Sequence, residues 1–301
     1  MQKSRGRRLL GGSLLVAATV IWGVSFVVLK NTLDLIPPLW IMGIRFLGGA
    51  VLLALVNVKK LRHLNGRCLA CGALLGAMLF CAYLLQTYGL RYTTPGKNAF
   101  LTAAYCVIVP FLGRLFYKNR IDRFNVIAAV VCLAGIGLVS LRRDLSVNLG
   151  DALTLGCSVF FAIHIVLLDR FVKRMDIALL IIVQFAVVGA ASFLLAPLAG
   201  EKPAALTADV LPSLLYICLM CTVVAYLCQS YGQKNTPPSE AALLLSLESV
   251  FGVLASIVFY REAMTAQLVA GFTLIFAAVV ISETKLSFLR RPLPAERDRA
   301  V

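Results

Sequence analysis

The chain has 301 residues, of which 60% are hydrophobic and 14% are charged, and its formal net charge is +15. Soluble domains carry about a quarter charged residues, so this composition excludes an ordinary water-soluble domain. The positive charge does not indicate nucleic-acid binding, because the basic residues stand at the ends of apolar runs and not along one helix face. We therefore expect an all-α polytopic membrane protein embedded in a lipid bilayer.

Apolar runs of about 20 residues recur along the chain, and a helix of that length crosses a hydrocarbon core of about 30 Å. In chain order the runs predict ten transmembrane spans: 9–29, 39–58, 68–88, 98–117, 124–141, 150–168, 178–199, 211–231, 239–260 and 264–283. A basic segment, 1–8, precedes the first span. A basic tail, 284–301, follows the last span, and we expect it to be disordered.

One stretch of the sequence is present twice. When residues 82–121 are moved forward by 143 positions, they align without a gap with residues 225–264. Polar and turn-forming residues agree as well as apolar ones: Gln86, Tyr88, Thr93 and Pro95 meet Gln229, Tyr231, Thr236 and Pro238. Apolar composition alone does not produce such agreement. The chain is therefore predicted to be a tandem duplication of two five-span repeats, 9–141 and 150–283.

The loop charges predict the orientation of these repeats. With the N-terminus in the cytoplasm, about 20 of the Lys and Arg residues fall on the inside and only about 7 on the outside, as the positive-inside rule requires. Ten spans then return the C-terminus to the cytoplasm. Because each repeat has an odd number of spans, the second repeat is inserted upside down relative to the first. Secondary transporters with this plan place their substrate site near the midplane, between the repeats.

Several short motifs occur along the chain in a characteristic order: WGVSF at 22–26, Pro38 and then Arg45-Phe46, NAFLTAAY at 98–105, LESVF at 247–251, Glu262, and the segment 271–283. In this order, and across both repeats, they resemble the EamA-type branch of the drug/metabolite transporter superfamily. The resemblance covers nearly the whole chain. It implies a permease of the cell membrane that moves a small metabolite without ATP hydrolysis, often by exporting amino acids or related compounds, and it does not specify the substrate.

Glu248 is the one acidic residue deep within a predicted span. It stands about nine residues from the cytoplasmic end, so about 13 Å into the membrane, and the repeat pairs it with Tyr105. A carboxylate at this depth is costly unless it is paired, hydrated or neutral. It is therefore a candidate for binding a substrate ammonium group or a proton. The alternative is a structural carboxylate that fixes its helix against its neighbours.

Arg45 lies about 10 Å below the outer end of the second span, where a cation without a partner is also costly. It is a candidate for binding a substrate carboxylate, for latching the outer gate, or for holding Glu248 across a cavity. The alternatives are a structural ion pair and a side chain that extends to the outer interface.

Asn98, Thr102 and Tyr105 are spaced i, i+4 and i+7, which places them on one face of a helix. Polar groups aligned in this way face protein or water and not lipid. They are candidates for lining a cavity, and the alternative is that they join helices by hydrogen bonds.

The other candidates for the substrate pathway come from both repeats. Two pairs recur at the offset of the gapless repeat, two residues belong to the WGVSF motif, and one is a lone histidine: Tyr83 with Tyr226, Gln86 with Gln229, Trp22, Ser25 and His164. Each also has a structural interpretation, because Tyr is common at membrane interfaces, small residues allow close helix packing, and a single histidine is more often a packing residue than a proton relay.

Other function classes lack their signatures in this sequence. The two histidines have no nucleophile–base or zinc-protease setting, and no P-loop is present, so we expect no enzyme, no catalytic or metal site and no cofactor. A membrane scaffold without transport activity would be expected to carry a substantial soluble domain. Within transporters, a lipid or amphiphile flippase is the nearest alternative, and the sequence leaves open whether two copies form a homodimer.

Overall fold

A computed structural model describes residues 2–117, 121–140, 148–203, 207–236 and 238–285. Almost all of this chain is helical. The first repeat forms α1 (Gln2–Thr32), α2 (Pro38–Val56), α3 (Val58–Leu61), α4 (Gly66–Tyr92), α5 (Pro95–Thr102), α6 (Tyr105–Tyr117) and α7 (Arg123–Ser140). The second forms α8 (Leu149–Val172), α9 (Ile177–Leu198), α10 (Leu211–Leu215), η1 (Tyr216–Val224), α11 (Ala225–Asn235), α12 (Pro238–Ala255), η2 (Ser256–Tyr260) and α13 (Ala266–Thr284). The tail that we expected to be disordered lies outside the described residues, apart from its first two positions.

Within the described ranges, nine helices are long and apolar enough to cross a membrane, and the shorter apolar helix Ala266–Ser282 adds a tenth. The prediction of an all-α membrane protein with ten transmembrane helices is therefore confirmed. Five crossings belong to each repeat. Because five is odd, equivalent helices of the two repeats run in opposite directions, which is the inverted-repeat arrangement.

Local sequence signals begin most of these helices. Thr94 accepts a hydrogen bond from the backbone N–H of Lys97 at the start of α5, and Asp176 accepts two at the start of α9. Thr265 caps α13 in the same way, and Pro38 and Pro95 occupy first-turn positions where their missing N–H costs nothing. The starts of these helices are thus set by residues that can be recognised in the sequence.

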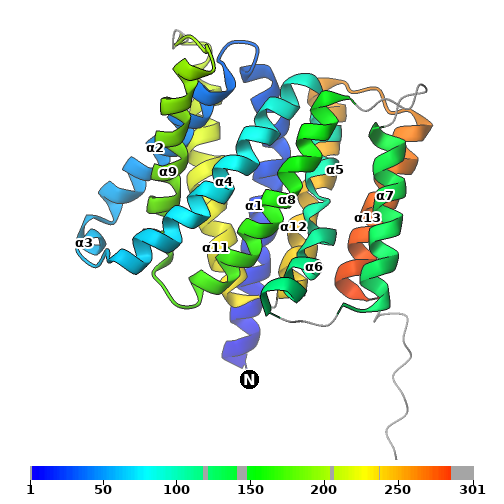
Figure 1. The fold of residues 1–301 in the computed structure, drawn as a ribbon, viewed down its shortest axis with the longest axis horizontal. Helices are drawn as coiled ribbons and strands as arrows, with labels where there is room; N and C mark the ends of the chain where they lie inside the picture. The colour runs from blue at the N-terminus through cyan, green and yellow to red at the C-terminus, as the bar shows by residue number, and fades with distance from the viewer. Residues whose placement is uncertain (1, 118–120, 141–147, 204–206, 237, 286–301) are drawn as a thin grey trace, which may run out of the picture.

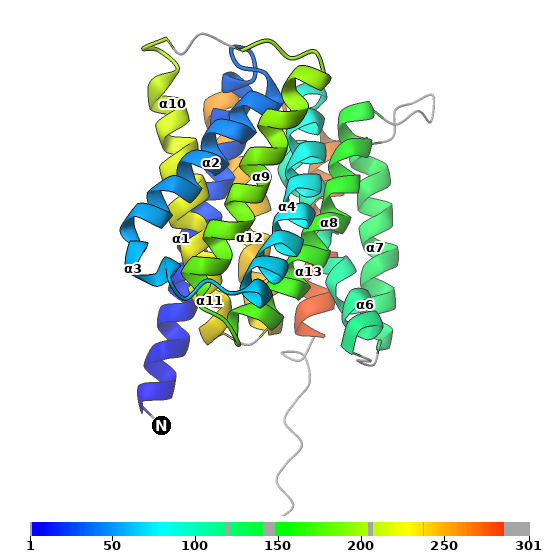
Figure 2. The same cartoon turned by 60° about the vertical axis from the view of Figure 1, so that its left-hand side comes forward.

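The two repeats interleave and do not sit side by side. The most extensive helix contacts all join one repeat to the other: α7 with α13, α4 with α8 and α9, α2 with α9, and α1 with α11 and α12 (Figures 1 and 2). Residues of both repeats consequently meet along the middle of the bundle.

Equivalent glycines make two of these contacts possible. A Cβ atom on Gly89 of α4 would lie 2.9 Å from the carbonyl oxygen of Gly150 in α8. At the equivalent position in the second repeat, a Cβ atom on Gly232 of α11 would lie 3.1 Å from the carbonyl oxygen of Gly11 in α1. Small residues of this kind let transmembrane helices approach closely.

The expected span 98–117 is not one uninterrupted helix. It divides into α5 and α6 at Ala103–Ala104, where backbone N–H groups bond three residues back: Ala104 to Leu101, Cys106 to Ala103 and Val107 to Ala104. Such bonds tighten the turn and change the direction of the side chains that follow. The straight helical face that we expected for Asn98, Thr102 and Tyr105 is therefore interrupted before Tyr105.

Candidate functional site

A cavity lies where the two repeats meet. Its walls come from α1, α4, α5, α6, α8, α11 and α12, with the lining residues Trp22, Tyr83, Gln86, Thr102, Tyr105, Phe161, His164, Ile165, Tyr226, Gln229 and Glu248. The volume open to the centres of water-sized spheres is about 30 Å³, which is enough for about two water molecules. In this conformation the cavity is therefore small, and side chains fill most of the space between the repeats. Within the described residues, no group of three or more His, Cys, Asp and Glu side chains is placed to hold a metal ion.

The residues that line the cavity include equivalent positions of the two repeats. Two different sequence separations, called offsets here, relate the equivalent positions. Helices α5 and α12 begin at Pro95 and Pro238, the separation that the gapless sequence repeat requires, and we call this the long offset. Helices α2 and α9 begin at Pro38 and Ile177, which stand four positions closer together, and we call this the short offset. The first two spans of the repeats thus follow a short offset that the gapless sequence comparison missed.

Four pairs of equivalent residues make up most of the lining. Three of them keep an aromatic or an amide side chain on both sides, whereas the fourth pairs an aromatic residue with a carboxylate. They are Trp22 with Phe161 at the short offset, and Tyr83 with Tyr226, Gln86 with Gln229 and Tyr105 with Glu248 at the long offset. Phe161 and Ile165 were not predicted from the sequence, and for Phe161 the short offset from Trp22 is the signal that would have found it.

Two tyrosines join the repeats at the centre of the cavity. The hydroxyl of Tyr226 donates a hydrogen bond to that of Tyr83, with 3.1 Å between the oxygens. Each ring packs edge-on against a phenylalanine of its own repeat, with centroids 5.0 Å apart for Phe46–Tyr83 and 5.3 Å for Phe185–Tyr226. Phe46 and Phe185 are themselves equivalent at the short offset, and their ring centroids lie 5.3 Å apart. This aromatic cluster is consequently two-fold symmetric in its composition and its contacts.

Each tyrosine also packs against the first helix of the other repeat. The centroid of Trp22, on α1, lies 5.2 Å from that of Tyr226, and the centroid of Phe161, on α8, lies 5.3 Å from that of Tyr83. Both contacts are edge-on, the favoured geometry for aromatic pairs. The cavity wall is therefore built from rings that hold one repeat against the other.

Glu248 supplies the one carboxyl group of the cavity lining. Its side chain is partly buried on α12, and among the described residues it has no hydrogen bond and no ion pair. The equivalent residue, Tyr105, also lines the cavity, at the start of α6. A carboxylate without a partner in this setting carries a desolvation cost that a bound cation or proton would offset.

Arg45 contacts the cavity wall but is not part of its lining. It is buried, and its Nε donates a hydrogen bond to Oγ1 of Thr222 in η1 over 2.9 Å. Its guanidinium carbon lies 4.8 Å from the ring centroid of Phe46 and 4.7 Å from that of Tyr83, within cation–π range. The ion pair with Glu248 that we considered from the sequence is not present.

The repeat equivalent of Arg45 is a neutral residue. Gln184 follows it at the short offset, and Gln184 Oε1 lies 3.0 Å from Nε2 of His164, which lines the cavity. Because that oxygen can only accept, Nε2 of His164 carries a proton and donates it to Gln184. The same position in the two repeats therefore supports the cavity wall with a cation in one case and an amide in the other.

The remaining candidates divide between the cavity and its supports. Gln86 donates from Nε2 to Thr102 Oγ1 over 3.1 Å, and both line the cavity. Asn98 lies outside the lining and donates from Nδ2 to Thr154 Oγ1 over 2.7 Å, joining α5 to α8. Ser25 also lies outside it and bonds the carbonyl of Trp22, one turn earlier in α1. Nine of the twelve residues proposed from the sequence line the cavity, and the other three, Ser25, Arg45 and Asn98, do not.

One end of the bundle is closed by polar contacts between the repeats. This end, where α4 ends and α5 begins, is called here the α4–α5 end. Glu262 accepts hydrogen bonds from Thr94 Oγ1 and the Gly96 N–H, and Asp151 accepts from Thr93 Oγ1. Glu201 accepts from the hydroxyl of Tyr88 and the N–H of Leu39 over 2.6 and 2.9 Å. In each case a carboxylate of the second repeat holds donors of the first.

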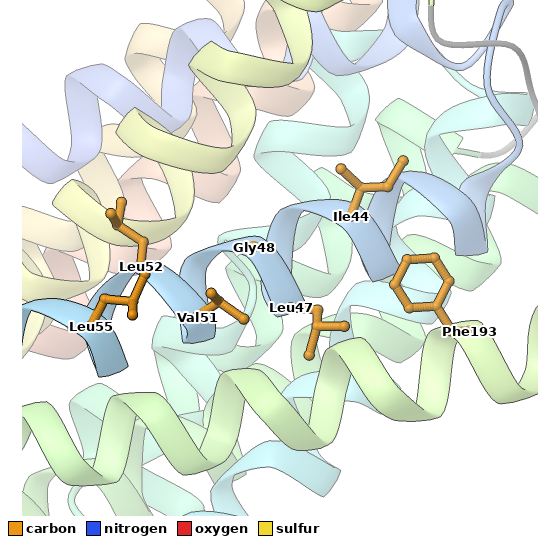
Figure 3. Close-up of a pocket in the computed structure, with 7 residues that line it drawn as sticks. All are labelled: Ile44, Leu47, Gly48, Val51, Leu52, Leu55 and Phe193. Carbon is orange, nitrogen blue, oxygen red and sulfur yellow. The ribbon is translucent and has the colours of Figure 1, made fainter. Parts of the chain in front are cut away.

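A larger hollow lies elsewhere, on the surface between α2 and α9. It has a volume of about 440 Å³ on the same measure and is lined by Ile44, Leu47, Gly48, Val51, Leu52, Leu55 and Phe193 (Figure 3). Leu55 is 70% exposed, and no lining side chain has a polar atom. An apolar surface of this kind on a membrane-spanning bundle faces lipid. We therefore regard the smaller central cavity as the candidate site.

Comparisons with known proteins agree with this architecture. The model of the EamA-like transporter family matches residues 9–141 and again residues 148–284. An uncharacterized transporter of Archaeoglobus fulgidus is 31% identical over 280 residues, which cover 92% of this chain and 87% of the relative. A solved crystal structure with 14% sequence identity matches with a TM-score of 0.70 over 93% of this chain and 99% of its own, which shows the shared fold.

Two further relatives have names that describe a function or a location. The inner membrane transporter YedA of Escherichia coli, also uncharacterized, is 28% identical over 93% of both chains. A probable amino-acid metabolite efflux pump of Salmonella typhimurium is 26% identical over 90% of this chain and 94% of its own. With two family matches that together span most of the sequence, this chain belongs to the EamA-like transporter family and is a multi-pass membrane transporter, not an enzyme.

Proposed function

We propose that the protein is a secondary transporter that carries a small metabolite, related to the amino acids, out of the cell by alternating access. The observation that supports this most is the position of the cavity between two inverted repeats, with equivalent residues of both repeats in its walls. Inverted-repeat transporters place their substrate there and expose it to each side in turn. The name of the Salmonella relative supports the substrate class and the direction.

The orientation follows from the loop charges. With both termini in the cytoplasm, the α4–α5 end faces the outside, and the carboxylates Asp151, Glu201 and Glu262 close the outer side of the cavity. At the opposite end, Lys60 pairs with Asp176 over 3.0 Å, but both side chains are at least 40% exposed. Exposed pairs contribute little. These contacts support a transporter that is closed towards the outside in this conformation and opens outwards when the three carboxylates release their donors.

Transport by purified protein in lipid vesicles tests the proposal. Vesicles loaded with labelled amino acids and their amides, esters and amines should release at least one of them without added ATP, and protein-free vesicles should not. Reporter fusions at His63 and Glu201 should read inside and outside, respectively. Release only in the presence of ATP would contradict secondary transport. Flipping of a fluorescent phospholipid, without release of any metabolite, would favour a flippase instead.

A further inference from the structure

We propose that the central cavity selects organic cations, that is, substrates with one ammonium group on an apolar or aromatic body and no carboxylate. This inference names the substrate class of the site described above and so rests on the proposed function. The juxtaposition that carries it is one carboxylate with no partner among the described residues, Glu248, lining the same cavity as five aromatic side chains. The volume of about 30 Å³ in this conformation is smaller than such a substrate, so binding requires the cavity to widen.

The first step is the charge of the lining. Among the lining residues, Glu248 is the only Asp, Glu, Lys or Arg side chain. The other titratable side chains that face the cavity are His164 and the tyrosines Tyr83, Tyr105 and Tyr226. His164 donates from Nε2 to Gln184 and is buried with no acidic partner among the described residues, a setting that disfavours a positive charge on its ring. The cavity therefore offers a ligand one carboxyl group and no guanidinium or ammonium group.

The second step is the position of the nearest cation. Arg45 is held by Thr222 on one side and by the rings of Phe46 and Tyr83 on the other, and it forms no ion pair within the described residues. Among the lining residues, its guanidinium packs over the ring of Tyr83. A substrate carboxylate would consequently find no guanidinium or ammonium group in the lining, whereas a substrate ammonium group would find Glu248.

The third step is the aromatic content of the wall. Trp22, Tyr83, Tyr105, Phe161 and Tyr226 all line the same space as Glu248. The faces of aromatic rings carry partial negative charge, and rings gathered in this way bind alkylammonium groups by cation–π attraction. The attraction strengthens when the cation is removed from water. Ring faces repel anions, so ring faces turned to the cavity and the carboxylate favour the same charge.

The fourth step concerns amino acids themselves. A zwitterion brings its carboxylate into a lining with one carboxylate already present, and burial of a charge without a partner is costly. An amine, amide or ester derived from the same amino acid keeps the ammonium group and loses the second charge. We therefore expect the site to prefer the derivative over the parent amino acid.

The test is direct binding to the purified full-length protein, measured by isothermal titration calorimetry in detergent. Four ligands of similar body differ in charge: phenethylamine, phenylalanine, 3-phenylpropanoate and phenethyl alcohol. Tetraethylammonium is added because it is a cation that cannot donate a hydrogen bond. For the wild-type protein we expect phenethylamine to bind about tenfold or more tightly than phenylalanine, with the anion weakest. Equal or tighter binding of phenylalanine or the anion, or no binding of either cation, would overturn the proposal.

The same binding measurements are repeated on the variant Glu248→Gln, with Asp176→Asn as its control. Both variants remove one negative charge, but Asp176 is an exposed residue that caps α9, a role that Asn retains. In Glu248→Gln, cation affinity should fall about tenfold or more while phenethyl alcohol is unaffected, and in Asp176→Asn neither should change. Unaltered cation binding in a folded Glu248→Gln protein would refute the assignment. If this variant does not fold, the ligand series on the wild type decides alone.

Binding and transport separate the two proposals. Cations that bind at Glu248 but are never released from vesicles would leave the present inference standing and count against secondary transport. Release of zwitterionic amino acids together with no binding of cations would support secondary transport and refute the present inference.

Discussion

The two repeats provide the cavity with the same framework but with different charges. Tyr83 and Tyr226 occupy equivalent positions, hydrogen bond to each other, and pack against equivalent phenylalanines. The residues that carry charge have no charged equivalent: Glu248 corresponds to Tyr105, and Arg45 corresponds to Gln184.

This difference separates two requirements. Alternating access needs two repeats of similar shape, because each must pack against the other in both conformations, and rings and amides can meet that need in either repeat. Recognition of an asymmetric substrate needs no symmetry in the site. The comparison therefore supports the proposal that the symmetric residues hold the repeats together and the asymmetric ones determine what is carried.

The largest difference in transport and stability is expected between the variants Arg45→Ala and Gln184→Ala. The first removes a hydrogen bond from a charged group and two cation–π contacts, which together contribute about 3 kcal/mol to the free energy of unfolding. We expect transport below about a tenth of wild type. Arg45→Lys should restore part of it, because an ammonium group lacks the planar fork.

Gln184→Ala loses one neutral hydrogen bond, worth about 1 kcal/mol. Thermal midpoints in detergent and vesicle transport at equal expression measure both variants. Equal losses in the two would mean that the guanidinium contributes nothing beyond a single hydrogen bond.

An intermediate difference in stability is expected between alanine variants of the equivalent glycines Gly89 and Gly232. In Gly89→Ala the new Cβ would lie 2.6 Å from Thr154 Oγ1 and 2.9 Å from the Gly150 carbonyl oxygen, and backbone cannot easily move. In Gly232→Ala its nearest neighbour, at 2.6 Å, is the side chain of Leu15, which can change rotamer.

We expect Gly89→Ala to lower the free energy of unfolding by about 1–3 kcal/mol and Gly232→Ala to lower it by less. Gly66, where a Cβ would have nothing within 4 Å, provides the control Gly66→Ala, which should leave the thermal midpoint nearly unchanged. A larger effect at Gly232 would show that the two helix contacts are not packed as described.

The smallest difference in stability is expected between the variants Tyr83→Phe and Tyr226→Phe. Each removes the same hydrogen bond between the repeats, so each should cost about 1 kcal/mol of stability, and the double variant should cost little more than either one. A double-mutant cycle on thermal midpoints measures this coupling. Strictly additive losses would show that the two hydroxyls stabilise the protein independently.

Much of the candidate site was readable before the structure. The gapless repeat brought Tyr83, Gln86, Tyr226 and Gln229 together, and burial cost singled out Glu248. Arg45 was harder to place, since depth along a helix does not tell which neighbours surround a side chain. Its contacts with Thr222, Phe46 and Tyr83 depend on how η1 and α4 pack against α2.

The sequence by itself determined the number of helices, the duplication and the inverted arrangement, because these depend on hydropathy, length and the odd number of spans in each repeat. Only the tertiary structure revealed the short offset of the first two spans, the break between α5 and α6, and the closed α4–α5 end. Each of these depends on contacts between residues far apart in the chain. Packing across the repeats, and not local sequence preference, decides which side chains share the cavity.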